Sequence, residues 1–181
     1  MISESSSPDI YRITNFNSNY LLKLQNIYFA ENYCYRHLPG LVKRIPKNEL
    51  RGLLDAHIYI ITIRKIRLEK LLLEMNNKAH GIVCLTFKKL IGKAITIIYH
   101  LNEKEANNIP DLISALLEIS IYRSYLYNTL FQLTQSLEKP QIQSAYLECL
   151  REEDEFFHSL LRVKKNLTDT DFTLDSTFQS A

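Results

Sequence analysis

The sequence is poor in the residues that break regular structure and in those that build disulfide frameworks. Its 181 residues include only four glycines and five prolines, too few for a turn-rich β-sandwich or barrel, so we expect long helices joined by few breaks. The three cysteines, Cys34, Cys84 and Cys149, lie far apart and form no CxxC pair. An odd number of distant cysteines does not suit a disulfide framework, and we expect free thiols in a reducing, cytoplasmic setting.

Long apolar runs and a strong net charge are also missing. No stretch reaches the roughly 18 uninterrupted apolar residues of a membrane-spanning helix. The first 20 residues are polar and serine-rich, without the apolar centre of a signal peptide. A formal net charge of +2 gives no electrostatic reason to expect nucleic-acid or membrane binding. Nucleotide-binding chemistry has no support either, since no glycine-rich phosphate loop is present.

What the sequence does contain is enough apolar material for one domain. Apolar residues make up 46% of the chain and charged residues 23%, the composition of a globular domain of this length. Both ends are polar. We therefore predict a flexible leader over residues 1–16, a helical bundle over 17–165 and a flexible tail over 166–181.

Apolar residues recur at three- and four-residue steps in five segments, a spacing typical of amphipathic helices. The segments cover about residues 17–45, 46–77, 82–101, 111–136 and 139–160. Residues 57–63 and the end of the third segment are rich in β-branched side chains, but we expect helix there because packing overrides propensity. The pattern predicts an all-α fold with four long helices and one shorter one.

Four stretches match one family in order and spacing. They are IYFAENYCYRHLP (Ile27–Pro39); NELRGLLDAH (Asn48–His57) with RLE (Arg67–Glu69); Cys84 leading into LIGKA (Leu90–Ala94); and DLISALLEISIYRSYLYNTL (Asp111–Leu130) followed by CLREEDEFFHSL (Cys149–Leu160). The chain resembles the YciE/YciF family, a stress-associated bacterial branch of the ferritin-like bundles. The resemblance implies a ferritin-like up-down four-helix bundle with an extra shorter helix.

The resemblance also implies a di-metal centre, which needs carboxylates and imidazoles converging from four helices. Glu31 keeps the carboxylate of the first helix. The matching stretch of the second helix, Ile58–Thr62, holds neither acid nor histidine, and Ser120 to Arg123 stand where the family has Glu-His-Tyr-Glu. Glu152 and Glu153 are kept in the last helix, but Phe157 replaces the next acid. We predict that this metal site is degenerate and holds no cofactor.

Two interpretations of the surviving acids, Glu31 and Glu153, remain open. They are solvated helix charges, or they stay inside and pair with Arg123, whose fixed charge would replace that of the lost metal. We interpret His57 as a core or boundary histidine that hydrogen-bonds a neighbouring helix, rather than as a metal ligand. The run Arg64–Lys70 is interpreted as a solvated basic face.

These observations favour a non-enzymatic, stress-associated bundle that acts through protein–protein contacts, forms a homodimer and has a further protein partner not yet named. The alternative is a di-iron or di-manganese oxidase or peroxidase with the unconventional ligands Glu31, His57 and Glu153. A third option is a small-ligand binder, with an apolar pocket where Ile60, Ile61, Ile121 and Phe157 replace ligands.

Overall fold

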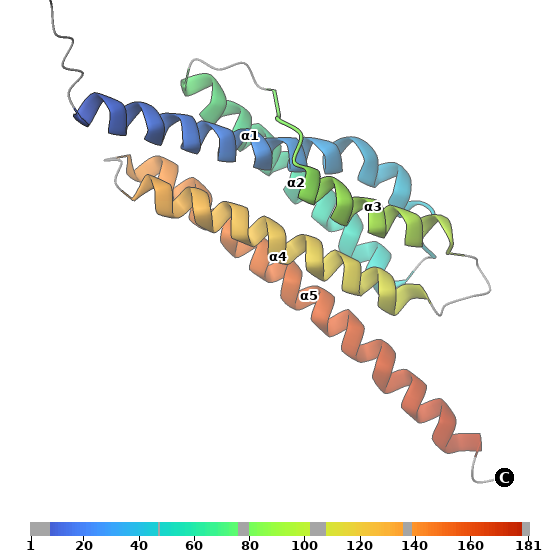
Figure 1. The fold of residues 1–181 in the computed structure, drawn as a ribbon. Coiled ribbons are helices and arrows are strands. Elements are labelled where there is room, and N and C mark those ends of the chain that lie inside the picture. The colour runs from blue at the N-terminus through green and yellow to red at the C-terminus, as the bar shows by residue number, and fades with distance from the viewer. Residues whose placement is uncertain (1–7, 47, 76–79, 102–107, 136–138, 179–181) are drawn as a thin grey trace, which may run out of the picture.

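In the computed structural model every regular element of the described chain is a helix. The description covers residues 8–46, 48–75, 80–101, 108–135 and 139–178, with side chains from 18 to 167. The helices are α1 (Pro8–Val42), α2 (Glu49–Glu74), α3 (Leu85–Tyr99), α4 (Ile109–Thr134) and α5 (Pro140–Phe178) (Figure 1). The all-α prediction is confirmed, and the β-branched stretches are helical.

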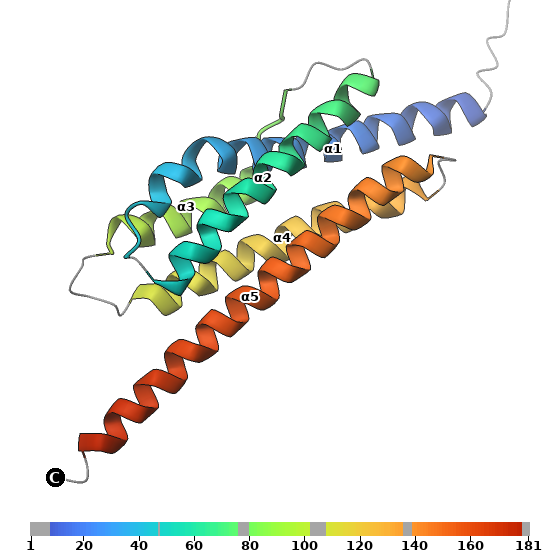
Figure 2. The same cartoon turned by 180° about the vertical axis from the view of Figure 1, so that it is seen from behind.

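The four long helices enclose a common core. α1 packs along α2 and α4, and α5 packs along the other sides of α2 and α4 (Figure 2). The short helix α3 lies on the outside, against α4 and α1. It carries the chain back along the bundle, so α2 and α4 run in the same direction (Figure 1). The expected up-down alternation therefore holds only when α3 is counted.

Local sequence explains where the helices begin. Pro8 and Pro140 are the first residues of α1 and α5, and Pro110 lies in the first turn of α4; proline suits this position because its missing N–H has no partner in the first turn. Asn48 caps α2 by accepting a hydrogen bond from the backbone N–H of Arg51 at 3.0 Å.

The last helix extends beyond its predicted end near Leu160. No glycine or proline follows Pro140, so nothing in the backbone interrupts α5, and its C-terminal part projects past the other helices (Figure 1). α1 likewise starts inside the segment predicted as a leader. Residues 1–7 and 179–181 lie outside the described part of the chain, and the domain limits stay a prediction.

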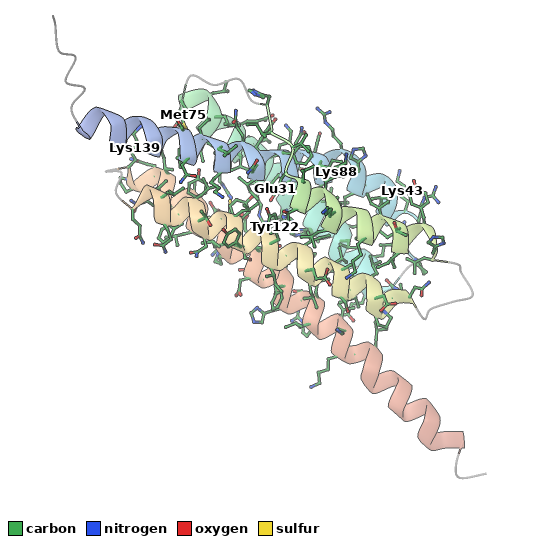
Figure 3. The ribbon with its side chains drawn as sticks, viewed as in Figure 1. Glu31, Lys43, Met75, Lys88, Tyr122 and Lys139 are labelled. Carbon is green, nitrogen blue, oxygen red and sulfur yellow. The ribbon has the colours of Figure 1, made fainter. Side chains whose placement is uncertain are left out.

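The core is made of apolar side chains from all five helices, and Glu31 lies in the middle of it (Figure 3). One glycine fixes the path into α3. A Cβ at Gly81 would lie 2.6 Å from the Cα of Phe29, so only glycine lets this segment pass so close to α1. None of the helices, over the residues described, is long and apolar enough to cross a membrane.

Candidate functional site

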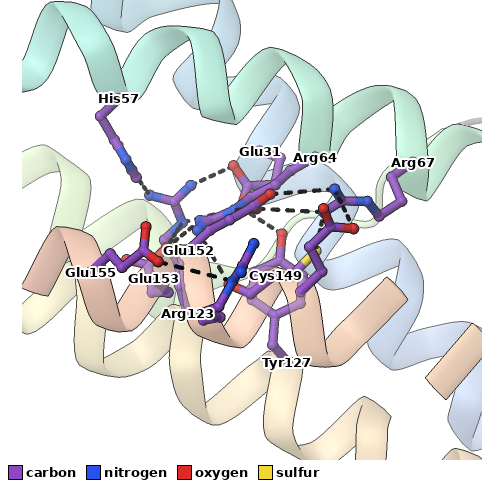
Figure 4. A network of polar contacts seen from close by, with 12 residues as sticks. Glu31, His57, Arg64, Arg67, Arg123, Tyr127, Cys149, Glu152, Glu153 and Glu155 are labelled. Atoms are coloured by element: carbon purple, nitrogen blue, oxygen red, sulfur yellow. Dashed lines mark hydrogen bonds and ion pairs between the residues drawn. The ribbon is translucent and has the colours of Figure 1, made fainter. Parts of the chain in front are cut away.

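Four charged side chains meet at mid-length of the bundle, one from each long helix. They are Glu31 from α1, Arg64 from α2, Arg123 from α4 and Glu153 from α5 (Figure 4). Their side chains are 0–2% exposed. We call these four residues the central cluster. Its formal charge is zero, with two carboxylates and two guanidinium groups.

Arg123 binds Glu31 with two nitrogens on one edge of its guanidinium group. Its Nη2 lies 2.5 Å from Oε2 of Glu31, and its Nε donates to Oε1 at 3.2 Å. The same Nε lies 3.6 Å from Oε2 of Glu153. The structure therefore brings together the three residues that the sequence analysis had singled out, with the arginine between the two carboxylates.

Arg64 is the member of the cluster that the sequence analysis missed. It donates to Oε2 of Glu153, to Oε2 of Glu152 at 2.8 Å and to the backbone carbonyl of Cys149 at 3.2 Å. Its Nη1 also lies 3.8 Å from Oε1 of Glu31. The interpretation of the run from Arg64 as a solvated face is thus wrong for its first residue.

A signal for Arg64 was present in the sequence. The residue falls at three- and four-residue steps with His57, Ile61 and Leu68, which are all buried on the inner side of α2. A cation in an apolar stripe needs a buried counter-charge. That condition links Arg64 to the acids of α5.

Electrostatics keep both guanidinium groups ionised. Burial by itself lowers the pKa of Arg64 and of Arg123, but the carboxylates of Glu153 and Glu31 outweigh it, and both pKa values lie above the ordinary arginine value. The cluster therefore contains two permanent positive charges.

Tyr127 completes the inner side of the cluster. Its hydroxyl donates to Oε1 of Glu31 at 2.7 Å, and the guanidinium of Arg64 lies 5.6 Å from the centre of its ring. Burial, and then the charge of Glu31, raises the pKa of Tyr127 well above its usual value. The hydroxyl keeps its proton and remains a donor.

His57 contacts the cluster as a neutral ring. Its Nε2 lies 3.0 Å from Nη1 of Arg123, and since arginine only donates, Nε2 must accept. Its pKa is lowered by burial first and then by the charges of Arg123 and Arg64. The ring stacks on Phe156 at 3.6 Å between centres. The prediction of a core histidine bonded to a neighbouring helix is confirmed.

A second layer of ion pairs and hydrogen bonds, centred on Arg67, lies between the central cluster and the surface. Arg67 reaches Glu148 at 2.9 Å and Glu152 at 3.3 Å, and its Nη1 lies 3.0 Å from Sγ of Cys149. Through Glu152, which also accepts from Arg64, this layer is continuous with the central cluster.

The matching family model covers residues 15–173, which is most of the chain; it is described as a domain of unknown function, DUF892. The chain belongs to the DUF892 family. Among solved structures, this DUF892 chain is similar to the Escherichia coli stress protein YciF, with a TM-score of 0.77 and 23% identity over 85% of this chain and 97% of that one. YcfI from Rhodopseudomonas palustris is similar with a TM-score of 0.72 and 19% identity over 88% and 97%. The resemblance to the YciE/YciF family is confirmed. A search of curated proteins gives no match.

The residues of this DUF892 chain do not fit the di-metal centre that the resemblance implies. One observation would favour a metal: Oε1 of Glu153 is buried and has no hydrogen-bond partner among the described residues. Against it, two guanidinium groups lie among the carboxylates where cations would have to bind. No group of three or more His, Cys, Asp or Glu side chains in the described chain could hold a metal ion.

The remaining residues considered for sites are dispersed. Of the apolar replacements, Ile61 is buried, Ile60 lines a groove of about 390 Å³ between α2 and α5, and Ile121 is 58% exposed on α4. The four residues expected for a ligand pocket therefore do not share one cavity.

Proposed function

We propose that this DUF892 chain is a non-enzymatic, ferritin-like bundle protein, stress-associated like the family it resembles. It acts through protein–protein contacts, and its first partner is a second copy of itself. The return of the chain along the bundle through α3 supports the ferritin-like assignment, because ferritin-like bundles contain one long crossover connection.

The observation that carries the proposal is the pair of guanidinium groups in the central cluster. Arg123 binds Glu31 and Arg64 binds Glu153, so each surviving carboxylate already has a full cationic partner. A divalent cation would have to enter beside two permanent positive charges that the protein cannot remove by deprotonation. The degenerate site is in this view a structural ion-pair network.

The competing function is a di-iron or di-manganese oxidase or peroxidase that uses Glu31, His57 and Glu153. The free Oε1 of Glu153 is the observation in its favour. Two contacts weaken it: the Nε2 of His57 faces Arg123, and both oxygens of Glu31 are within 3.2 Å of Arg123. Metal binding would require both to be displaced.

The proposal further places the protein in the cytoplasm, supported by three cysteines that are unpaired in the structure. It includes no role with nucleic acid or membranes.

Metal content decides between the two functions. The purified protein is incubated with Fe(II) or Mn(II) in air, desalted and analysed by plasma mass spectrometry, while oxygen and peroxide consumption are followed. We expect substoichiometric metal and no consumption above buffer. Stoichiometric metal and peroxide turnover that both disappear in Glu31→Ala would establish the oxidase and overturn the proposal. An exposed acid, Glu155→Ala, is the matched control.

A further inference from the structure

The side of α2 that faces away from the bundle carries a second apolar stripe. The inner side of this helix buries residues such as Leu54, Ile61 and Leu68. On the outer side Tyr59, Ile66 and Leu73 are 68%, 52% and 60% exposed, at intervals of seven residues. Three large side chains this exposed on one line need an explanation.

Three more positions complete the outer stripe, which we define as Ala56, Tyr59, Ile63, Ile66, Lys70 and Leu73. Their spacing of three and four residues is the heptad spacing of a coiled-coil seam. Ile63 is half-buried and Ala56 and Lys70 are exposed. The long helices that pack along α2 are α1 and α5, and no helix lies in front of α2 in Figure 2.

A groove lies beside one end of the outer stripe. It has a volume of about 390 Å³ and lies between α2 and α5, where Leu53, Ala56 and Ile60 face Phe156. The small side chain of Ala56 leaves this end hollow, whereas Leu73 at the other end of the stripe stands out from the surface. The two ends are 17 residues apart, which is roughly 26 Å along a helix.

We propose that the outer stripe is the homodimer interface, formed by two antiparallel α2 helices related by a two-fold axis between Ile63 and Ile66. In this register Leu73 of each copy enters the groove at Ala56 of the other. Ile63 meets Ile66, and Lys70 lies over the ring of Tyr59. The proposal rests on the proposed function, because it names the surface by which that function's self-association occurs.

Self-complementarity identifies the occupant as a second copy. In this register every position of the outer stripe gains a partner of suitable size or charge. The small Ala56 faces the large Leu73, the branched Ile63 faces the branched Ile66, and the ammonium group of Lys70 faces the ring of Tyr59. Shifting the register by one heptad leaves either Leu73 or Tyr59 in water. Parallel pairing fails for a different reason, since Lys70 would oppose Lys70 and Ala56 would oppose Ala56.

Cysteine crosslinking tests the register directly. The variant carrying both Ala56→Cys and Leu73→Cys is oxidised mildly and run on non-reducing gels. The native cysteines do not compete, because all three are buried. We expect a covalent dimer from the double variant and from a mixture of the two single variants, but not from either single variant alone. A bond within one chain is excluded by the separation of the two sites.

Crosslinking of each single variant with itself would show parallel pairing and overturn the proposal, and so would no crosslink in the double variant. Light scattering supplies the second measurement. Ile66→Glu should raise the dimer dissociation constant by roughly a hundredfold, since it buries an unpaired charge in the interface. The control Ile121→Glu places the same charge at a similarly exposed isoleucine on α4 and should leave the dimer intact. Equal effects of the two variants would overturn the proposal.

Metal analysis of the same samples separates this proposal from the function on which it rests. A metal-free protein that dimerises through another face refutes the interface alone, whereas a metal-free monomer refutes both the interface and the self-association included in the proposed function. A dimer with the predicted crosslinks and stoichiometric metal refutes the metal-free function and leaves the interface standing.

Discussion

Removing one guanidinium group from the central cluster should lower the free energy of unfolding much more than removing the same group from the surface. Arg123→Met keeps the length and apolar volume of the side chain but deletes its charge. The charge of the cluster changes from zero to −1, and Glu31 retains only Tyr127 at 2.7 Å and the more distant Arg64 at 3.8 Å. Breaking a buried ion pair by removing one partner costs about 3–5 kcal/mol.

The loss of stability in Arg123→Met is a large part of the total free energy of unfolding, which is only about 5–15 kcal/mol for a typical domain. For a chain of this length it corresponds to a decrease in Tm of roughly 6–20 °C. The assay is urea unfolding followed by circular dichroism at 222 nm, with thermal melting as a second measurement. Adding Glu31→Gln to Arg123→Met removes the unpaired charge, and we expect this double variant to regain at least about 1 kcal/mol over the single one.

The matched control is Arg151→Met. Arg151 and Glu155 form an ion pair of 3.9 Å on the same bundle, but their side chains are 70% and 71% exposed. Its loss should change the stability by no more than about 0.5 kcal/mol. If Arg123→Met costs no more than this control, or if Glu31→Gln brings no recovery, the idea of a desolvated ion-pair network is refuted.

Three further predictions concern neighbouring groups. Arg64→Lys keeps the charge but loses the three-way donation to Glu153, Glu152 and a backbone carbonyl, so urea unfolding should show a loss of about 2 kcal/mol; an unchanged midpoint would contradict it. The pKa of His57 is lowered in the folded protein, so only the unfolded chain gains this proton as pH falls below about 6.5, and stability decreases by up to about 1.4 kcal/mol per pH unit. In His57→Gln this contribution to the pH dependence of stability between pH 7.5 and 5.5 should vanish. Equal pH dependence in the variant and the unmodified protein would refute the prediction. Burial raises the pKa of the Cys34 thiol to about 12 and that of the Cys149 thiol to about 11. A thiol reagent at pH 8 should therefore label neither cysteine until the protein unfolds. Rapid labelling of the native protein would show that the core opens and would contradict the prediction.

Much of the fold follows from the sequence because helical periodicity and proline positions are local. Pro110 and Pro140 mark two helix starts, and residues 57–63 are helical despite their β-branched side chains. The end of α5 was predicted too early because a polar composition was taken for a break, although no residue there interrupts the backbone.

The site was harder to predict because it depends on contacts between helices. Arg123 attracted attention since it stands in place of a family acid, whereas Arg64 lies two residues beyond Thr62, where the stretch compared with the family's ligands ends. Arg64 and Lys65 are neighbours in one basic run, but one side chain is buried and the other reaches Glu69 near the surface. The helical phase of α2 distinguishes them, because Arg64 lies in line with the buried Ile61 and Leu68. Which acids Arg64 meets depends on the register of α2 against α5, and a single sequence does not give that register.

The pairing of Glu31 with Arg123 and of Glu153 with Arg64 has a consequence for when this protein can fold. A bundle held by iron or manganese completes its core only after the ion is delivered, and it loses the core to chelators or to oxidation of the metal. Guanidinium groups are synthesised with the chain, have no redox chemistry and do not dissociate. The proposed core is thus complete as soon as translation ends, at any supply of metal and under oxidants that would strip an iron site. A protein built in this way can be made during metal starvation without waiting for, or consuming, the scarce ion.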